Sequence, residues 1–466
     1  MPETKPLDKT NTIAGLHAAY RDGSLSPVQV VEGYLDAIAS IDPLLGAYQA
    51  TWSESALAMA WAAEKALDSG YDLGPFHGIP FALKDIFHVS GTVTTCGSAA
   101  MLDRVADTTS PIVSRLMEAG GIILGKTKTV ECAFGGWGTN QKMGTPKNPW
   151  DMETHRIPGG SSSGSAVAVA SGMAVCGVGS DTGGSVRMPA AYCGIVGLKV
   201  TAGRLPLDGI MPLSQTLDSP GPMTQTVEDA VIMLEAMDGR EGWKISRDLA
   251  AGTGLYANLS KGVAGLRLGA ISPQERDQCA ADILEAYDMA LDRLAALGAR
   301  IDVFDNPVAY GDLADDNGLI TAVEAYANHG AYYSDESLPM DEDVRKRMLT
   351  GQTYSGHEYV RKLERRNQLI REFGMCIKGF DALITPSTIG TAPALSTIDQ
   401  AIAPGYFTRP FNYLAMCALS VPISLNDSGL PTSLQIVGRA HDEAMVLRIG
   451  AAFEKDMPPI GRPVLA

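Results

Sequence analysis

The sequence predicts a layered α/β fold that forms one large domain. Between about residues 74 and 200, short apolar runs alternate with glycine-rich turns and with segments of helical period. This pattern is typical of strands and helices packed in layers. No low-complexity linker and no internal repeat divides the 466 residues. A single domain over 1–466 is therefore predicted, although the length alone would allow two or three.

The predicted elements follow in order along the chain. Ser26 and Gln29 have the spacing of a capping box, with proline at the first helical position, so a helix is predicted to begin there. A second amphipathic helix is predicted over 56–68, strands at 79–83, 122–124 and 175–178, helices at 112–119 and 164–171, mostly helical segments at 225–300 and 318–375, and strands at 381–386, 421–425 and 435–437. These elements give N-terminal helices in 1–70, a core in about 70–225, a helical insertion in about 225–375, and C-terminal strands with a helix in about 376–466.

The composition excludes several classes of function. Hydrophobic residues make up 45% of the chain, and the net charge is -16 without any basic run, which argues against direct nucleic-acid binding. The most apolar stretch, residues 166–179, is too short to span a membrane, and the polar N-terminus is unlike a signal peptide. Seven single cysteines without a CxxC pair indicate reduced thiols in the cytoplasm. The scattered Cys and His residues give no support for a metal site.

Two glycine- and serine-rich loops are the most unusual features of the sequence. Residues 159–165 (GGSSSGS) would, taken alone, suggest a flexible turn. A helix of small apolar residues and a short strand follow, and they lead to residues 179–187 (GSDTGGSVR). Because a rigid buried scaffold carries both loops, they are predicted to hold catalytic residues.

The second loop has the chemistry to bind a developing oxyanion. Gly183 and Gly184 lack side chains, so their N–H groups can approach a ligand closely. Ser185 precedes a short predicted helix, whose first N–H groups carry the positive end of the helix dipole. This arrangement suits an oxyanion with Ser185 as the attacking group. An anion-binding loop without a nucleophile is the alternative, although neither common nucleotide-binding glycine motif is present.

A serine nucleophile needs a base, and Lys84 is the best candidate. No motif marks the histidines near these segments, which are predicted to be structural. Lys84 follows the apolar run 79–83 and should lie at the end of a buried strand, where loss of hydration lowers the pKa of a lysine. The sequence leaves open the alternative that Lys84 pairs with the neighbouring Asp85.

Together these segments resemble the amidase signature family. The matching segments are residues 78–85 (GIPFALKD), 159–162 (GGSS), 181–190 (DTGGSVRMPA), 193–199 (CGIVGLK) and 429–438 (GLPTSLQIVG). The 24 positions from Ser161 to Ser185 also match the spacing in the family. The resemblance implies the amidase signature fold, a single large domain with a central mixed β-sheet flanked by helices on both faces.

The resemblance also implies a role for each matched residue. Ser185 would be the acyl-forming nucleophile, Ser161, preceded by a cis peptide bond, the proton carrier, and Lys84 the base. The oxyanion hole would consist of the backbone N–H groups of Thr182, Gly183, Gly184 and Ser185. The acyl pocket would be lined by Ala133, Phe134, Gly135 and Gly136, and the loop would be supported by Asp181 and Arg187.

The activity implied is hydrolysis of a small-molecule amide, anilide, urea or carbamate, with release of amine or ammonia and with water as co-substrate. No cofactor is implied, and a homodimer would be unremarkable. One residue departs from the family pattern, because Ser163 stands where many members have glycine. The geometry of the first loop is therefore open.

Three other interpretations compete with a free-standing amidase. Residues 160–164 match the GxSxG pattern of α/β-hydrolases, which would make Ser162 the nucleophile. The chain could instead be the glutaminase component of a tRNA-dependent amidotransferase, its A subunit, which would pass ammonia to a partner. A non-catalytic binding protein of the same fold is the third alternative. Because Lys84, Ser161 and Ser185 are all present, the free-standing amidase is favoured.

Overall fold

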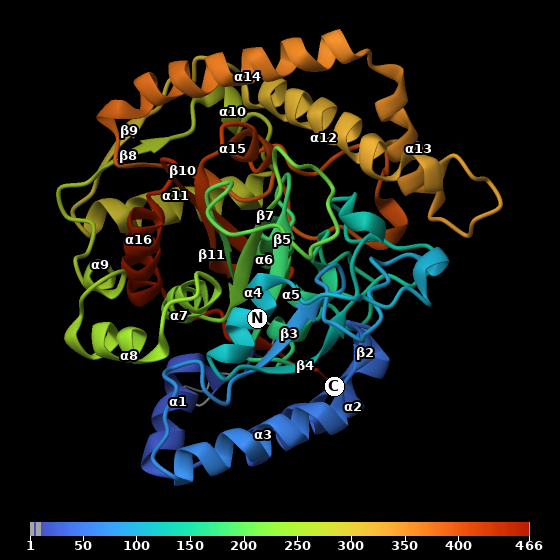
Figure 1. The fold of residues 1–466 in the computed structure, drawn as a ribbon. Coiled ribbons are helices and arrows are strands. Elements are labelled where there is room, and N and C mark those ends of the chain that lie inside the picture. The colour runs from blue at the N-terminus through green and yellow to red at the C-terminus, as the bar shows by residue number, and fades with distance from the viewer. Residues whose placement is uncertain (1–3, 6–10, 466) are drawn as a thin grey trace.

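The computed structural model describes residues 4–5 and 11–465 and has the predicted single-domain α/β fold (Figure 1). Its main sheet has 11 strands in the order β2-β4-β3-β5-β7-β6-β11-β12-β10-β8-β9. The strands of this sheet are β2 (Tyr48–Thr51), β3 (Pro80–Lys84), β4 (Ile122–Thr127), β5 (Cys176–Asp181), β6 (Val196–Lys199), β7 (Ser219–Thr224), β8 (Arg267–Ala270), β9 (Arg300–Val303), β10 (Ala382–Pro386), β11 (Cys417–Leu425) and β12 (Pro431–Gly438). A separate pair is formed by β1 (Thr4–Lys5) and β13 (Arg462–Pro463).

Helices flank the main sheet on both faces. They are α1 (Ile13–Asp22), α2 (Pro27–Leu45), α3 (Ser53–Asp68), α4 (Pro111–Glu118), α5 (Ser163–Ala170), α6 (Arg187–Cys193), α7 (Val227–Met237), α8 (Gly242–Ala251), α9 (Tyr256–Leu259), α10 (Pro273–Arg276), α11 (Ala281–Ala296), α12 (Tyr310–Tyr333), α13 (Glu342–Thr350), α14 (Gly356–Cys376), α15 (Arg409–Tyr413) and α16 (Glu443–Asp456). Figure 1 shows α12, α13 and α14 gathered on one side of the molecule and α1 to α3 on the opposite side. None of the helices in the described part of the chain has the length and hydropathy to cross a membrane.

The sheet is mixed, as predicted. Strands β3, β4 and β5 are parallel neighbours, and so are β10, β8 and β9. The strands between these two groups, β7, β6, β11 and β12, pair in antiparallel fashion. Because β3 and β5 are parallel, their carboxyl ends lie at the same edge of the sheet. This is the edge at which α/β proteins commonly place their sites.

The capping box predicted at the start of α2 is present. The Ser26 hydroxyl accepts from the Gln29 N–H at 3.3 Å, and the Gln29 side chain accepts from the Ser26 N–H at 3.0 Å. These bonds satisfy N–H groups that a helix start would otherwise leave without a partner. The helix ends at Gly46, whose φ of 66° lies in the left-handed region that glycine favours. Residues 1–3 and 6–10, most of the polar N-terminus considered above, lie outside the described residues.

The segment 225–375, predicted as a helical insertion, departs from that prediction by adding two strands to the sheet. Strands β8 and β9 pair with each other, and β8 pairs with β10, all in parallel. Each has only four residues, which is too short for alternation to stand out between long helices. The sheet is therefore wider than the apolar runs of the sequence indicate.

Candidate active site

Lys84 is the last residue of β3, and its side chain is fully buried. Its Nζ donates hydrogen bonds to Ser161 Oγ at 2.8 Å and to Ser180 Oγ at 2.7 Å. Ser161 is also fully buried and follows a cis peptide bond between Gly160 and Ser161. The structure thus brings two of the predicted catalytic residues into direct contact at the carboxyl edge of the sheet.

The environment of Lys84 favours its neutral form. Burial lowers the pKa of Lys84 to about 7, against the opposing effect of the Asp218 and Asp181 carboxylates. The neighbouring Asp85 pairs with Lys126 on β4 instead, at 3.2 Å. The alternative that Lys84 is neutralised by Asp85 is therefore wrong, and Lys84 can act as a base near neutral pH.

Ser185 lies across from Ser161 at the mouth of the site. The two loops are tied together by a main-chain hydrogen bond from the Ser162 N–H to the Ser185 C=O at 3.2 Å. Within the described residues, no hydrogen bond joins the Ser185 hydroxyl to that of Ser161. Ser185 is one of the residues that line the cavity described below. Catalytic hydrogen bonds often close only when substrate is bound.

Asp181 and Arg187 form a fully buried ion pair that shapes the loop between them. Arg187 donates from Nη2 to Asp181 Oδ1 at 2.9 Å and from Nε to Oδ2 at 3.0 Å. Burial acts to raise the pKa of Asp181, but Arg187 outweighs it and holds that pKa below its usual range. The same carboxylate accepts from the N–H groups of Gly184 at 2.7 Å and Val186 at 3.1 Å. The pair therefore fixes the backbone around Ser185.

This arrangement corrects the predicted oxyanion hole at one position. The Gly184 N–H points inward to Asp181 and is not free to bind a ligand. The other three predicted donors are the N–H groups of Thr182, Gly183 and Ser185. Among the described residues they have no hydrogen-bond acceptor, so they are available to a ligand. Gly184 matters through its shape instead: its φ is 122°, and a Cβ there would stand 2.2 Å from Thr408 Oγ1.

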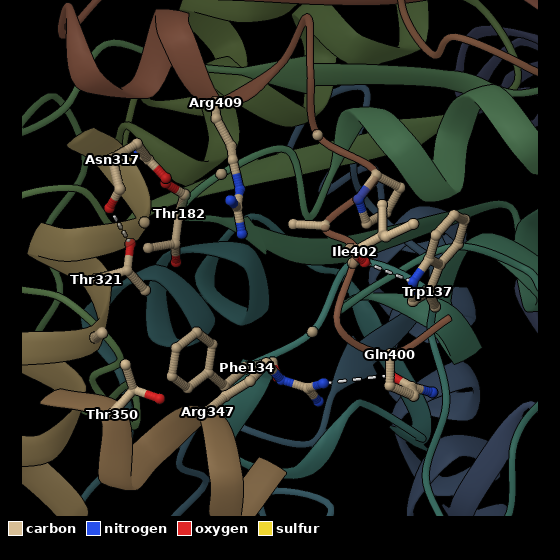
Figure 2. Close-up of a pocket in the computed structure, with 18 of the residues that line it drawn as sticks. Phe134, Trp137, Thr182, Asn317, Thr321, Arg347, Thr350, Gln400, Ile402 and Arg409 are labelled. Atoms are coloured by element: carbon tan, nitrogen blue, oxygen red, sulfur yellow. Dashed lines mark hydrogen bonds between the residues drawn. The ribbon is translucent and has the colours of Figure 1, made fainter. Parts of the chain in front are cut away.

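A cavity of about 800 Å³ opens in front of Ser185. It is lined by the predicted pocket residues Ala133, Phe134, Gly135 and Gly136, by the catalytic loop, by α12 and α13, and by residues 399–405 (Figure 2). Trp137 holds this last segment in place, because its Nε1 donates to the C=O groups of Asp399 at 3.1 Å and Ile402 at 2.9 Å. The volume is that of a site for a small molecule.

Comparison with known proteins agrees with this geometry. A family model described as Amidase matches residues 29–447. The chain belongs to the amidase signature family. It is 35% identical to 2-amino-5-chloromuconic acid deaminase of Comamonas testosteroni, with 94% of each chain covered, and 34% identical to the glutamyl-tRNA(Gln) amidotransferase A subunit of Geobacter metallireducens, with 95% of this chain and 96% of that one covered. A solved amidase superposes with a TM-score of 0.86 at 28% identity, covering 96% of this chain and 100% of that chain.

Members of the amidase signature family are enzymes that act on carbon–nitrogen amide bonds, and this chain is one of them. Its relatives include both a deaminase of a small molecule and amidotransferase A subunits, so family membership leaves the substrate open. The described residues hold no group of three or more His, Cys, Asp or Glu side chains arranged for a metal ion.

Two contacts around the amidase site were missed in the sequence. Ser180 is a second hydroxyl partner of Lys84, although its only signal is its place one residue before the Asp-Thr-Gly-Gly-Ser motif. Asp218 accepts from the hydroxyl of Thr182, the second residue of that motif, and burial raises the pKa of Asp218 to about 6. Asp218 precedes β7 and carries no motif of its own.

Ser163, the departure from the family pattern, needs no special backbone geometry. It is the first residue of α5 and does not have a positive φ. Its hydroxyl donates to the Lys128 C=O at 3.4 Å. A glycine at this position would therefore not be required for its conformational freedom, and the loop keeps Ser161 against Lys84.

Proposed function

We propose that the protein is a free-standing hydrolase that cleaves an amide-type bond of a small molecule through an acyl-enzyme on Ser185. The observation that carries the proposal is the 2.8 Å hydrogen bond between Lys84 Nζ and Ser161 Oγ, next to Ser185 at the cavity. Neutral Lys84 accepts the proton of Ser161, and Ser161 accepts that of Ser185 as Ser185 attacks the carbonyl carbon. A hydroxyl thus becomes a nucleophile without a histidine.

The negative charge that develops on the carbonyl oxygen is stabilised by backbone donors. In this mechanism the N–H groups of Thr182, Gly183 and Ser185 donate to that oxygen. The Asp181 carboxylate, paired with Arg187, fixes the loop that carries them through its bonds to the Gly184 and Val186 N–H groups. Donors that are fixed before reaction need no reorganisation when the charge appears. They stabilise the transition state more than the neutral substrate.

The same relay then works in reverse. Protonated Lys84 returns its proton through Ser161 to the leaving nitrogen, the C–N bond breaks, and amine or ammonia departs. Water then attacks the ester on Ser185, and its proton passes through Ser161 to Lys84. As the bond between the acyl carbon and Ser185 Oγ breaks, the proton returns through Ser161 to Ser185 Oγ, and the acid product is released. Ser180, the other partner of Lys84, keeps Nζ aimed at Ser161 throughout.

The test is release of amine from a panel of small amides, anilides, ureas and carbamates, with trapping of the intermediate. Wild type is expected to turn over part of the panel, and mass spectrometry of quenched protein should find an acyl group or a fluorophosphonate on Ser185. Ser185→Ala should lower kcat by about 10³-fold or more. Ser162→Ala is the matched control, because the Ser162 hydroxyl bonds only the main chain of Ser180, donating to its C=O and accepting from its N–H. Ser185 should still be labelled in this variant.

Two results would overturn the proposal. Labelling of Ser162 in place of Ser185 would indicate the α/β-hydrolase chemistry instead. Wild type that neither reacts with the panel nor forms a covalent adduct would show that the folded chain lacks this activity by itself.

A further inference from the structure

Arg409 carries a positive charge at the cavity wall without a counter-charge in contact. It is the first residue of α15, and Figure 2 shows its side chain extending into the cavity. Its Cγ lies 3.1 Å and its Nε 3.6 Å from the position that a Cβ on Gly183 would take, so the guanidinium passes directly over the catalytic loop. In the described part of the chain, no ion pair or side-chain hydrogen bond engages this guanidinium.

Arg347 on α13 brings a second positive charge to the same cavity. Its Nε donates to the Phe134 C=O at 3.0 Å and its Nη1 to Gln400 Oε1 at 3.2 Å. Both acceptors are neutral, and the Asp341 and Asp343 carboxylates act on Arg347 only from a distance, where burial outweighs them and lowers the pKa of Arg347. Its Nη2 lies 3.2 Å from the position that a Cβ on Gly135 would take, beside the predicted acyl pocket.

The two arginines influence each other. Burial lowers the pKa of Arg409 to about 10, the carboxylate of Asp315 opposes this, and the like charge of Arg347 adds to it. Repulsion between two partly buried cations is relieved when an anion binds between them. Arginine suits this task because its planar fork of donors matches both oxygens of a carboxylate.

Other charged groups also border the cavity, namely Asp315, Asp343, Asp399 and Lys346. Asp315, Asp399 and Lys346 are exposed, and Asp343 accepts from the Gln141 side chain at 2.7 Å. Over the described ranges, none of these carboxylates forms an ion pair with Arg347 or Arg409. The wall near Gly183 and Gly135 therefore keeps its positive charge for a ligand.

We propose that Arg409, assisted by Arg347, binds a carboxylate of the substrate, so that the preferred substrates are amides that also carry a carboxylate group. This inference rests on the proposed amide hydrolysis at Ser185, because it places the carboxylate in the same cavity as the bond to be cleaved. Half-amides of short dicarboxylic acids are the simplest members of this class. Neutral amides of the same length lack the group that the two guanidinium groups would bind.

The first test compares amides matched in length but not in charge. Succinamate and glutaramate are paired with the neutral pentanamide and hexanamide, and kcat/KM is measured for each. Wild type is expected to favour the charged member by about 100-fold, as for a charge-assisted bond made away from bulk water. Arg409→Gln should abolish most of this preference, and Arg409→Lys should keep part of it, since lysine retains the charge but not the fork. Thermal unfolding of each variant checks that it is folded.

Lys346→Gln is the control, because it removes an exposed charge of the same sign at the cavity border. The preference of this variant should stay within about threefold of wild type, as expected for a screened surface charge. Equal rates for charged and neutral amides in wild type would overturn the inference. So would an Arg409→Gln variant that keeps the wild-type preference.

The second test does not depend on turnover. Calorimetry on Ser185→Ala measures binding of succinate and glutarate, the products of such half-amides, with and without the additional change Arg409→Gln. Binding that weakens by about tenfold or more in the double variant supports the inference, and an equal affinity overturns it.

If wild type hydrolyses no amide but dicarboxylates bind through Arg409, the proposed function fails and the carboxylate site stands. If neutral amides are hydrolysed and no dicarboxylate binds, only the carboxylate site fails.

Discussion

Two lysines on neighbouring strands share the same burial but have different partners. Lys84 ends β3, and Lys126 lies on the parallel neighbour β4, where it is paired in register with Leu83; their exposed fractions are 0% and 1%. Lys126 pairs with Asp85 at 3.2 Å and also donates to the Phe87 C=O at 2.6 Å. Lys84 instead donates to two serine hydroxyls. The two lysines thus belong to one sheet, but Lys126 contacts a carboxylate and Lys84 contacts only uncharged hydroxyl groups.

The comparison teaches that burial alone does not make a lysine a base. Burial lowers the pKa of both lysines, but the contacting Asp85 carboxylate opposes this at Lys126. Around Lys84 the nearest carboxylates act only at a distance, and its contacts are neutral hydroxyls that can relay a proton. A buried lysine with a carboxylate partner holds structure together, whereas one with hydroxyl partners can exchange protons.

The largest expected effect is on catalysis at Lys84. Lys84→Met removes the base but keeps the length of the apolar stem, so kcat for a good amide substrate should fall by about 10³- to 10⁴-fold. The fold should be retained, because no buried carboxylate is left without its partner. Urea unfolding and steady-state kinetics of the same preparation measure the two effects. A variant that keeps a tenth of wild-type activity would contradict the relay.

Lys126→Met should show the reverse pattern. Removing this lysine leaves Asp85 buried and unpaired, so we expect a loss of about 3–5 kcal/mol in the free energy of unfolding, measured by urea denaturation. The double variant Asp85→Asn/Lys126→Met also removes the unpaired buried carboxylate. It should recover part of the lost free energy of unfolding, which a double-mutant cycle quantifies. If Lys126→Met and Lys84→Met had the same free energy of unfolding, the two lysines would not differ in their contribution to stability, and this prediction would be wrong.

The sequence predicted much of this contrast but not its decisive part. The apolar runs located β3, β5 and β10 to within a few residues, and the motifs predicted Lys84, Ser161 and Ser185 as candidate catalytic residues, of which Lys84 and Ser161 are in contact. The sequence left open whether Asp85 pairs with Lys84. In the structure Asp85 pairs with Lys126, which is 41 positions further along the chain than Asp85 and comes close to it only because β3 and β4 are parallel neighbours. Pairing between strands is not a local property of the sequence.

Other elements of the site had no local signal for the same reason. Strand β7 has the sequence SPGPMT, whose two prolines argue against a strand, yet it pairs with β5 over its whole length. The segment 399–405 borders the cavity through contacts with residues far away in the chain, among them Trp137, which binds two of its carbonyl groups, and Arg347, which binds Gln400. Arg409 likewise faces Gly183 through the tertiary fold alone. The sequence could therefore predict which motifs carry reactive groups. It could not predict which residues from distant parts of the chain contact those motifs.

The smallest expected effect concerns the distant carboxylates that distinguish Lys84 from Lys126. In the proposed mechanism the neutral form of Lys84 is the base, so kcat/KM should rise with pH through about 7, where Lys84 loses its proton. The Asp218 carboxylate favours the protonated form of Lys84. Asp218→Asn removes this charge, so the pKa of Lys84 should fall and the rising limb of the profile should move to lower pH. Profiles of kcat/KM from about pH 5 to 9 measure the displacement.

The control for this prediction is Asp208→Asn, which removes an exposed carboxylate from the same stretch of chain. Solvent screens such a charge, so the rising limb should stay in place. Asp218 Oδ1 accepts from the Thr182 hydroxyl and Oδ2 accepts from the Leu213 and Ser214 N–H groups, so asparagine keeps an oxygen acceptor for only one of these two sides. A loss of kcat without any displacement of the limb would assign Asp218 to holding Thr182, whereas a displacement to lower pH would assign it to the charge balance of Lys84. A displacement to higher pH would contradict the sign of the interaction and the identity of Lys84 as the titrating base.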